Sequence, residues 1–320
     1  MANTELTSKT ATPLTRSVDG FKRALNSDLF YSFKHSPVTI VAMAVTLLII
    51  FTSVFANLVA PHNPFDVATM NLLDSELPPV WAEMGDPKYL LGTDNLGRDV
   101  FSTILYGSRV SLFVGFTSVV LSMVIGIALG LIAGYKGGLI DAFIMRVAEI
   151  QLSFPTILVA LLINGVMRGV LPPSQHAELA VLVLVLSIGL SNWVQFARTV
   201  RASTLVERNK EYVLAARLIG VKPLFIMIRH VLPNVMGPIL VIATLGLASA
   251  VLTEATLSFL GVGVPPTEPS LGTLINVGSD YLFSGSWWIT IFPGAALAIL
   301  VLAVNLVGDW LRDALNPKLR

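Results

Sequence analysis

The chain has 320 residues and a net charge of +1, and only 13% of its residues are charged, against about 25% in an average soluble domain. Hydrophobic residues make up 54% and the mean hydropathy is +0.76, which excludes an ordinary soluble enzyme, and a net charge so close to zero gives no reason to expect nucleic acid as a partner. The absence of cysteine excludes disulfides and thiolate metal sites.

Apolar runs long enough to cross a bilayer recur along the chain. Five runs of about 20 apolar residues carry almost no charge, and a sixth joins them if one embedded glutamate is allowed. They predict an all-α integral membrane protein, because a strand of a membrane barrel needs only about ten alternating residues. The six predicted transmembrane helices are Val38–Val59, Val110–Ala133, Ala148–Val170, Leu179–Ala197, Val235–Leu260 and Trp287–Val307.

The segments between these spans predict the topology. Residues 1–37 are polar and mildly basic, and the apolar run that follows is too long for a typical signal-peptide core, so we interpret it as an uncleaved first span. A cleaved signal ending near Ala60 is the alternative. With a cytoplasmic N-terminus, 17 basic residues fall on the cytoplasmic side and 4 on the other, the bias that the positive-inside rule expects. Both termini, including the tail 308–320, are therefore predicted to be cytoplasmic.

Two loops are too long to be simple connectors. The outer loop, residues 60–109, is rich in proline and acidic residues. It is either a lid or docking surface for an external partner, or a solvated tether. The inner loop, Arg198–Arg229, belongs to the predicted transmembrane core 110–307 and is more informative.

A short amphipathic helix is predicted at about residues 207–221 of the inner loop. Its apolar residues fall at i, i+3, i+4 and i+7, and they are Tyr212, Ala215, Ala216 and Ile219. Gly220, just past this stripe, suits a left-handed C-terminal cap. A helix with a shallow apolar face and charged flanks fits a groove in a partner protein. A basic helix lying on anionic lipid is the alternative.

The segment that contains this helix matches a known signature. The stretch EYVLAARLIGVKPLFIMIRHVLPN, residues 211–234, resembles the EAA signature of binding-protein-dependent ABC importer permeases, in which a short coupling helix docks on the nucleotide-binding subunit. The residues that match are Glu211, Ala215, Ala216, Gly220, His230, Leu232, Pro233 and Asn234. The resemblance implies that Glu211 makes a charge-assisted contact with the ATPase and that the two alanines seat the helix.

Further segments resemble the peptide and nickel branch of this family, and within it the C subunits of dipeptide and oligopeptide permeases. They are APHNP (60–64), LLGTDNLGRDVFS (90–102), YGSRVSLFVG (106–115), LSFLGVGVPPTEPS (257–270) and GDWLRDALNPKLR (308–320). The chain departs from the pattern at Leu271, where relatives usually place tryptophan. The fold implied is that of a type I ABC importer permease with six transmembrane helices.

The resemblance also implies partners and a location. They are a second, homologous permease subunit, two cytoplasmic ABC ATPases, an extracytoplasmic substrate-binding protein, a peptide cargo and the lipid bilayer of the bacterial inner membrane. A nickel chelate or another small solute is the alternative cargo. The sequence has no GxxxxGK[ST] phosphate loop, so ATP and Mg are expected on the partner subunits. We predict no catalytic residue and no cofactor on this chain.

Charged side chains at membrane depth are candidate functional residues by default. Arg146 and Glu149 stand at i, i+3 and can pair with each other. Glu254 lies near the outer end of the fifth span, where snorkelling, a contact between helices and pathway lining all remain open. The four histidines are scattered without ligand spacing, so no metal site is predicted.

Small residues and prolines predict how the spans pack and bend. Gly126, Gly130 and Gly134 share one face of the second span and predict close packing against another helix. Pro155 predicts a kink in the third span.

Two other classes of membrane protein make specific demands that the sequence can be checked against. A membrane-embedded hydrolase would need HExxH, GxSxG or paired intramembrane aspartates, and none of these is present. A self-sufficient channel or proton-coupled carrier would show a repeated intramembrane carboxylate or inverted halves, and no convincing internal repeat is visible.

Overall fold

A computed structural model describes residues 33–66, 71–265, 267 and 269–314, and in these residues the protein is helical. Extended backbone pairs there only in an isolated bridge between Thr93 and Asp99. The helices are α3 (Pro37–Val54), α4 (Ala56–Val59), α5 (Val100–Lys136), α6 (Gly138–Leu152), α7 (Thr156–Val170), α8 (Ala180–Glu207), α9 (Glu211–Leu218), α10 (Pro223–Ile226), α11 (Leu232–Phe259), α12 (Leu271–Ser279) and α13 (Trp288–Ala314), with short 3₁₀ turns at Leu72–Asp74 and Pro173–Gln175 and a π-helical turn, η3, at Met227–Val231.

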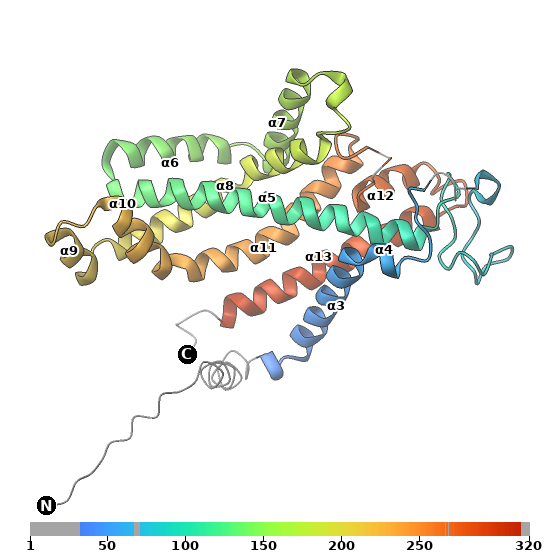
Figure 1. Cartoon of the computed structure of the whole chain (residues 1–320), viewed down its shortest axis with the longest axis horizontal. Coiled ribbons are helices and arrows are strands. Elements are labelled where there is room, and N and C mark those ends of the chain that lie inside the picture. Colours follow the sequence, from blue (N-terminus) through green and yellow to red (C-terminus); the bar gives the residue numbers. More distant parts are fainter. Residues whose placement is uncertain (1–32, 67–70, 266, 268, 315–320) are drawn as a thin grey trace, which may run out of the picture.

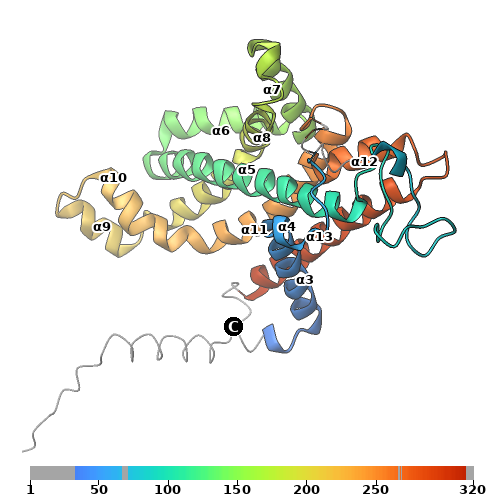
Figure 2. The same ribbon diagram turned by 45° about the vertical axis from the view of Figure 1, so that its right-hand side comes forward.

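The long helices form an elongated bundle with α9 at one end and α12 at the other, as Figures 1 and 2 both show. Five helical segments are long and apolar enough to cross a membrane, namely α3, α5, α8, the run Pro223–Phe259 that ends with α11, and α13. The predicted all-α architecture is confirmed. The start of α3 and the end of α13 lie together, because the ring of Phe33 packs edge-on against Trp310 at 5.4 Å.

The third predicted span, Ala148–Val170, is wrong as a single helix. It comprises the end of α6 and all of α7, which meet at an angle of 97° and are separated by residues 153–155. Pro155 has no N–H to donate and disfavours helical backbone at the residue before it, so the helix stops there instead of bending. α7 consequently stands out from the bundle (Figure 1).

The first predicted span is interrupted, because α3 ends at Val54 and the short helix α4 follows. Other helices run beyond the apolar stretches that predicted them. α5 has 37 residues and is therefore about 55 Å long, against roughly 30 Å of hydrocarbon. It begins at Val100, where the Asp99 carboxylate accepts the N–H of Ser102 at 3.0 Å as an N-cap. The second predicted span therefore starts too late, at Val110, and the fourth ends too early, at Ala197, because α8 continues to Glu207.

α13 likewise continues past the predicted end of the sixth span at Val307 to Ala314, so the first part of the predicted tail 308–320 is helical. The remainder of that tail, residues 315–320, and most of the predicted N-terminal segment, residues 1–32, lie outside the described residues.

The parallel pair α5 and α8 packs backbone against backbone, as the glycine spacing predicts. A Cβ atom on Gly126 would lie 2.3 Å from the Cβ of Phe196, and one on Gly130 would lie 2.6 Å from the carbonyl oxygen of Ala197. Gly134 is equally close to α8. Since real side-chain contacts do not come this close, only glycine fits along this seam.

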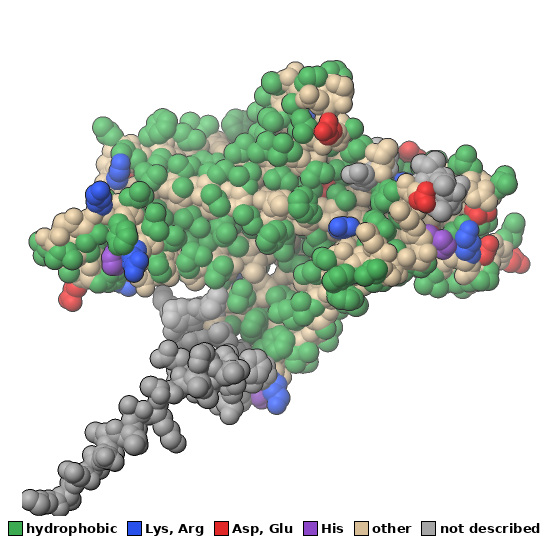
Figure 3. Space-filling view, viewed as in Figure 1, with side chains coloured by type: hydrophobic (Ala, Val, Ile, Leu, Met, Phe, Trp, Pro, Cys, Tyr) green, Lys and Arg blue, Asp and Glu red, His purple; other side chains and the backbone are tan. Residues whose placement is uncertain are grey.

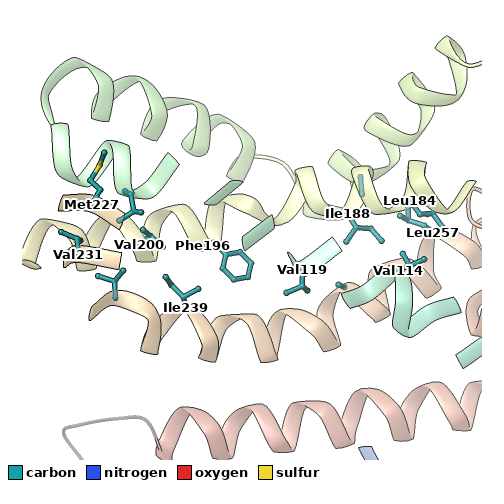
Figure 4. Packing of buried hydrophobic residues seen from close by; sticks show 14 of the residues in the cluster. Val114, Val119, Leu184, Ile188, Phe196, Val200, Met227, Val231, Ile239 and Leu257 are labelled. Carbon is teal, nitrogen blue, oxygen red and sulfur yellow. The ribbon is translucent and has the colours of Figure 1, made fainter. Parts of the chain in front are cut away.

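Buried hydrophobic side chains of α5, α8, α11 and η3 fill the space beside the seam (Figure 4). They include Val114, Val119, Leu184, Ile188, Phe196, Val200, Met227, Val231, Ile239 and Leu257. This core runs the length of the bundle, so the α9 end and the α12 end are parts of one packed body.

Residues 71–99, here named the folded loop, are packed and not a solvated tether. Arg98 and Asp94 form an ion pair at 2.7 Å with side chains only 3% and 4% exposed. The indole N–H of Trp288, at the start of α13, donates to the carbonyl oxygen of Thr93 at 3.0 Å. The tether alternative is therefore wrong for this stretch, and residues 100–109 of the predicted outer loop belong to α5.

Candidate functional site

The candidate coupling helix is α9, which projects at one end of the bundle (Figure 1). It covers Glu211–Leu218 only, so the predicted range 207–221 is too long: Glu207 is the last residue of α8 and residues 208–210 form the turn between the two helices. Gly220 has φ +81°, and the N–H of Val221 bonds to the carbonyl oxygen of Ala216 at 3.0 Å. This is the C-terminal cap predicted for Gly220.

The predicted apolar stripe of α9 is divided between two faces. Val213 and Ala216 are 0% and 5% exposed because they pack against the chain's own core. Ala215 and Ile219 are exposed instead. The prediction that both alanines seat the helix on a partner is therefore wrong for Ala216, while Ala215 remains available.

An exposed apolar surface, here named the apolar tip, covers the outer side of α9 and the turn that follows. Its members are Leu214, Leu218, Ile219, Leu224, Phe225 and Ile228. Leu218 is 89% exposed and Ile219 is 79% exposed, so these two project furthest from the bundle. Beside them a groove of about 580 Å³ is lined by Lys222, Leu224, Phe225, Ile228, Arg229 and Pro233. Large side chains exposed in this way are typical of an interaction surface.

Basic side chains flank the apolar tip, and Figure 3 shows blue and green side chains together at this end. The guanidinium of Arg229 lies 5.5 Å from the ring centre of Phe225. That of Arg217 lies 4.6 Å from the ring centre of Tyr135 and donates to its hydroxyl at 3.1 Å. These cation–π contacts hold the positive charges beside the tip.

A hydrogen-bonded frame centred on Glu207 holds α9 in place. Its carboxylate accepts the Lys210 ammonium at 2.6 Å and the Tyr212 hydroxyl at 2.5 Å. The side-chain amide of Asn234, at the start of α11, donates to the Tyr212 oxygen at 3.2 Å and to the carbonyl oxygen of His230 at 2.7 Å. The sequence analysis did not single out Glu207, because its partners Lys210 and Tyr212 stand at i+3 and i+5 across the turn between α8 and α9, and helical periodicity does not pair i with i+5.

Two arginines, one in α8 and one in the turn after it, fasten this part of the chain to neighbouring helices. Arg208 donates to the carbonyl oxygen of Gly134, at the end of α5, at 2.8 Å. Arg201 makes a two-point contact with the carboxylate of Asp141 on α6, at 2.5 and 2.7 Å. Bidentate pairs of this kind restrict orientation as well as distance. α9 is thus bonded directly to α5, α8 and α11, and α8 is in turn bonded to α6.

Replacing Tyr212 with phenylalanine is expected to loosen this frame. The variant removes a bond to a charged acceptor and one from Asn234, at a cost of about 1 kcal/mol for a partly exposed group. Burial and the bond to Glu207 raise the pKa of Tyr212 to about 12, so its contribution is fully present below the usual tyrosine value of 10.0 and falls only as the pH rises through about 12.

Amide hydrogen exchange of residues 205–234 measures the effect, and the Y212F variant should exchange faster there. Tyr281→Phe is the matched control, because its hydroxyl bonds to no described residue. Equal exchange in the wild type and Y212F would show that the frame does not hold α9.

The remaining predicted site residues occupy varied positions. Glu211 is the first residue of α9 and is exposed, without an ion pair to any described residue. His230 lies in η3, half-buried, with its ring 6.3 Å from that of Phe225. Pro233 stands in the first turn of α11, where no N–H donor is needed.

The predicted pair Arg146–Glu149 is confirmed at 3.2 Å, but both side chains are largely exposed. A solvent-exposed pair of this kind contributes at most about 1 kcal/mol. Glu254 is wholly buried at the opposite end of the bundle, so it does not snorkel and does not contact α9.

Comparison with known proteins gives the same picture over nearly the whole chain. Residues 126–320 match the family described as binding-protein-dependent transport system inner membrane component, and residues 25–79 match the N-terminal TM domain of oligopeptide transport permease C. The dipeptide transport system permease protein DppC of Haemophilus influenzae is 37% identical over 320 residues, which is all of both chains. The di/tripeptide transport system permease protein DppC of Pseudomonas aeruginosa is 40% identical and covers 92% of each chain.

One further relative and one solved structure extend the comparison. The oligopeptide transport system permease protein OppC of Bacillus subtilis is 36% identical over 93% of this chain and 91% of its own length. Among solved structures, an inward-facing form of the MetNI methionine ABC transporter is similar with a TM-score of 0.52 at 22% identity, over 68% of this chain and 97% of that one, which supports the fold alone. The chain therefore belongs to the family of binding-protein-dependent transport system inner membrane components and is a multi-pass protein of the inner membrane.

Proposed function

We propose that this chain is the C-type permease subunit of an ATP-driven importer of dipeptides or oligopeptides, and that α9 couples it to the partner ATPases. The observation that carries the coupling proposal is the apolar tip: Leu218 and Ile219 are almost fully exposed on a helix that is otherwise fixed to the bundle. Such a surface fits an apolar groove in another protein. Peptide cargo is supported by the named relatives, which are permease proteins of dipeptide, tripeptide and oligopeptide systems.

The proposed complex contains a second homologous permease, two ABC ATPases that bind ATP and Mg, and an extracytoplasmic substrate-binding protein. The family description names a binding-protein-dependent system, which supports the last of these. One side of α7, where Leu162, Val166 and Val170 are 67%, 57% and 78% exposed, would be covered by lipid or by the second permease. The α9 end and both termini would face the cytoplasm, in keeping with the distribution of basic residues.

The frame around Glu207 suits α9 to transmit force. In the proposed cycle the ATPases close on ATP and carry the apolar tip with them. Because α9 is bonded to α8 and to the start of α11, a displacement of the tip would move both helices and not merely swing a flexible loop. Glu211 would add a charge-assisted contact with the ATPase at the N-terminal end of α9.

Purification of the tagged chain from its native membrane in mild detergent tests the proposal, combined with uptake of radiolabelled dipeptides in cells lacking the chain. We expect a second permease and two P-loop ATPases to co-purify, and Glu211→Gln to reduce peptide-stimulated ATP turnover. The matched control is Glu149→Gln on α6, whose carboxylate pairs with Arg146 and with no other described residue. A chain that purifies alone without ATP turnover would contradict the importer assignment, and an assembled complex that imports no peptide would contradict the cargo.

A further inference from the structure

Glu254 of α11 is a carboxyl group enclosed entirely by the protein, at the α12 end of the bundle. Its side chain is 0% exposed. One carboxyl oxygen accepts the hydroxyl of Ser111 on α5 at 2.7 Å, and the other accepts the hydroxyl of Ser258 on α11 at 2.7 Å. Ser270, the N-cap residue of α12, lies next to the carboxyl and is itself 0% exposed. The carboxyl therefore joins α5 to α11, beside the start of α12.

Ser111 makes a second connection between the same elements. Its oxygen accepts the N–H of Leu271, the first residue of α12, at 3.2 Å. The Ser270 oxygen accepts the N–H of Thr273 at 3.3 Å. The first N–H groups of a helix have no partner within the helix, so two of those in α12 are satisfied by the serines around Glu254. Leu271 itself is 0% exposed, so the position where relatives usually have tryptophan is filled here by a core residue.

Glycines bring the same three helices into backbone contact. A Cβ on Gly272 of α12 would lie 2.4 Å from the carbonyl oxygen of Ala255 on α11. A Cβ on Gly107 of α5 would lie 3.1 Å from the side chain of Leu274 on α12. Packing this close leaves no space for α12 to slide or rotate against its neighbours.

The composition of the cluster also argues against two ordinary roles. Lining of a pathway would require exposure, which Glu254 lacks. Filling a core would be done at lower cost by leucine, because burying a carboxyl in a membrane protein is unfavourable unless its oxygens are satisfied. A carboxyl group does what leucine does not, since it accepts hydrogen bonds from several elements at once.

We propose that Glu254 is a positioning residue that locks α12 to α5 and α11, so that these elements move as one rigid unit during transport. The permease would then open at its α12 end by a joint movement of α5, α11 and α12, and not by a swing of α12 alone. This inference rests on the proposed function, because it concerns the transport cycle of an importer.

Distance measurement between two spin labels tests the lock directly. The chain has no cysteine, so labels on Asp280→Cys, directly after α12, and Phe113→Cys, on α5, attach at these two exposed positions alone within the chain. The complete complex is used, with accessible cysteines of the partner subunits replaced. We expect the same narrow distance distribution without nucleotide and with ATP bound to hydrolysis-deficient ATPases.

Variants then test whether Glu254 is responsible. Glu254→Ala and Ser111→Ala should each broaden the distribution, because losing these bonds lowers the ratio of docked to undocked α12 by about tenfold. Ser111→Ala leaves the carboxyl in place, so it provides the test if the Glu254→Ala variant does not assemble into the complex. Glu254→Gln should keep the narrow distribution, since the amide preserves the shape and the serine hydroxyls can rotate to donate or accept.

Ser122→Ala is the matched control. It removes another buried hydroxyl from α5, one whose bonds within the described part of the chain go to the carbonyl oxygens of Ser118 and Gly189 alone. The control should leave the distribution unchanged.

Three outcomes would overturn the lock, and each differs from a failure of the proposed function. A distance that changes with ATP in a complex that imports peptide would show that α12 moves separately. A narrow distribution in both alanine variants, or a broad one in Glu254→Gln, would show that the carboxyl's hydrogen bonds do not hold α12. Failure of the proposed function would appear earlier, as a chain that assembles with no ATPase.

Discussion

Replacing Leu218 with aspartate is expected to separate the chain from its proposed ATPase partners. Leu218 is 89% exposed at the centre of the apolar tip, so the change leaves the chain's own core untouched. In a docked complex the carboxylate would be buried in an apolar groove, and losing an anchor residue of this kind costs about 2 kcal/mol or more, or roughly a 30-fold loss of affinity. Co-purification of the ATPases and peptide-stimulated ATP turnover in membrane vesicles are the measurements.

Leu73→Asp is the control for that variant. Leu73 is 91% exposed, but it lies in the folded loop at the opposite end of the bundle from α9. It should retain the ATPases in full. Retention of the ATPases by Leu218→Asp would show that the apolar tip is not the docking surface.

Replacing Gly130 with leucine is expected to have the largest effect on stability. The new Cβ alone would lie 2.6 Å from the carbonyl oxygen of Ala197 and 2.7 Å from the Cβ of Val200, so α5 and α8 would have to separate along the seam. Overpacking of a well-ordered core costs about 1 to 3 kcal/mol, and this site is at the upper end because the obstruction includes backbone. Thermal unfolding of the detergent-purified chain, followed by the loss of monodisperse protein, measures it.

Gly294→Leu in α13 is the matched control, since a Cβ there meets no atom within 4 Å. It introduces the same side chain into another long apolar helix. If the two variants unfolded at the same temperature, the seam between α5 and α8 would not be the tight contact that its geometry indicates.

The helical fold and five of the six membrane spans could be predicted from the sequence, because the length of an apolar run is a direct signal for a membrane span. The ends of the helices could not be predicted. Hydropathy reports only the part of a helix that lies in hydrocarbon, whereas α5 and α8 continue into polar surroundings where caps such as Asp99 decide where they begin. The break before α7 was signalled by Pro155, but the size of the bend depends on the packing of both helices.

The candidate site was predictable in part for a similar reason. The EAA-like stretch located α9 and its glycine cap, which depend on residues close together in sequence. Which face of α9 turns inward depends on the space left by α5, α8 and η3, and no periodic pattern shows that Val213 and Ala216 fill it. The partners of Glu254 are equally hidden, since Ser111 lies 143 residues away along the chain.

The hydrogen-bonded frame around α9 also has a consequence for assembly. A docking element that is disordered before binding loses conformational entropy when its partner arrives, and that loss weakens the complex. Here Glu207, Tyr212 and Asn234 have already ordered the helix within the isolated subunit, so the entropy is lost during folding of the chain. An ATPase would meet a surface that is pre-organised for it, and nearly all the free energy of burying Leu218 and Ile219 would remain available as affinity.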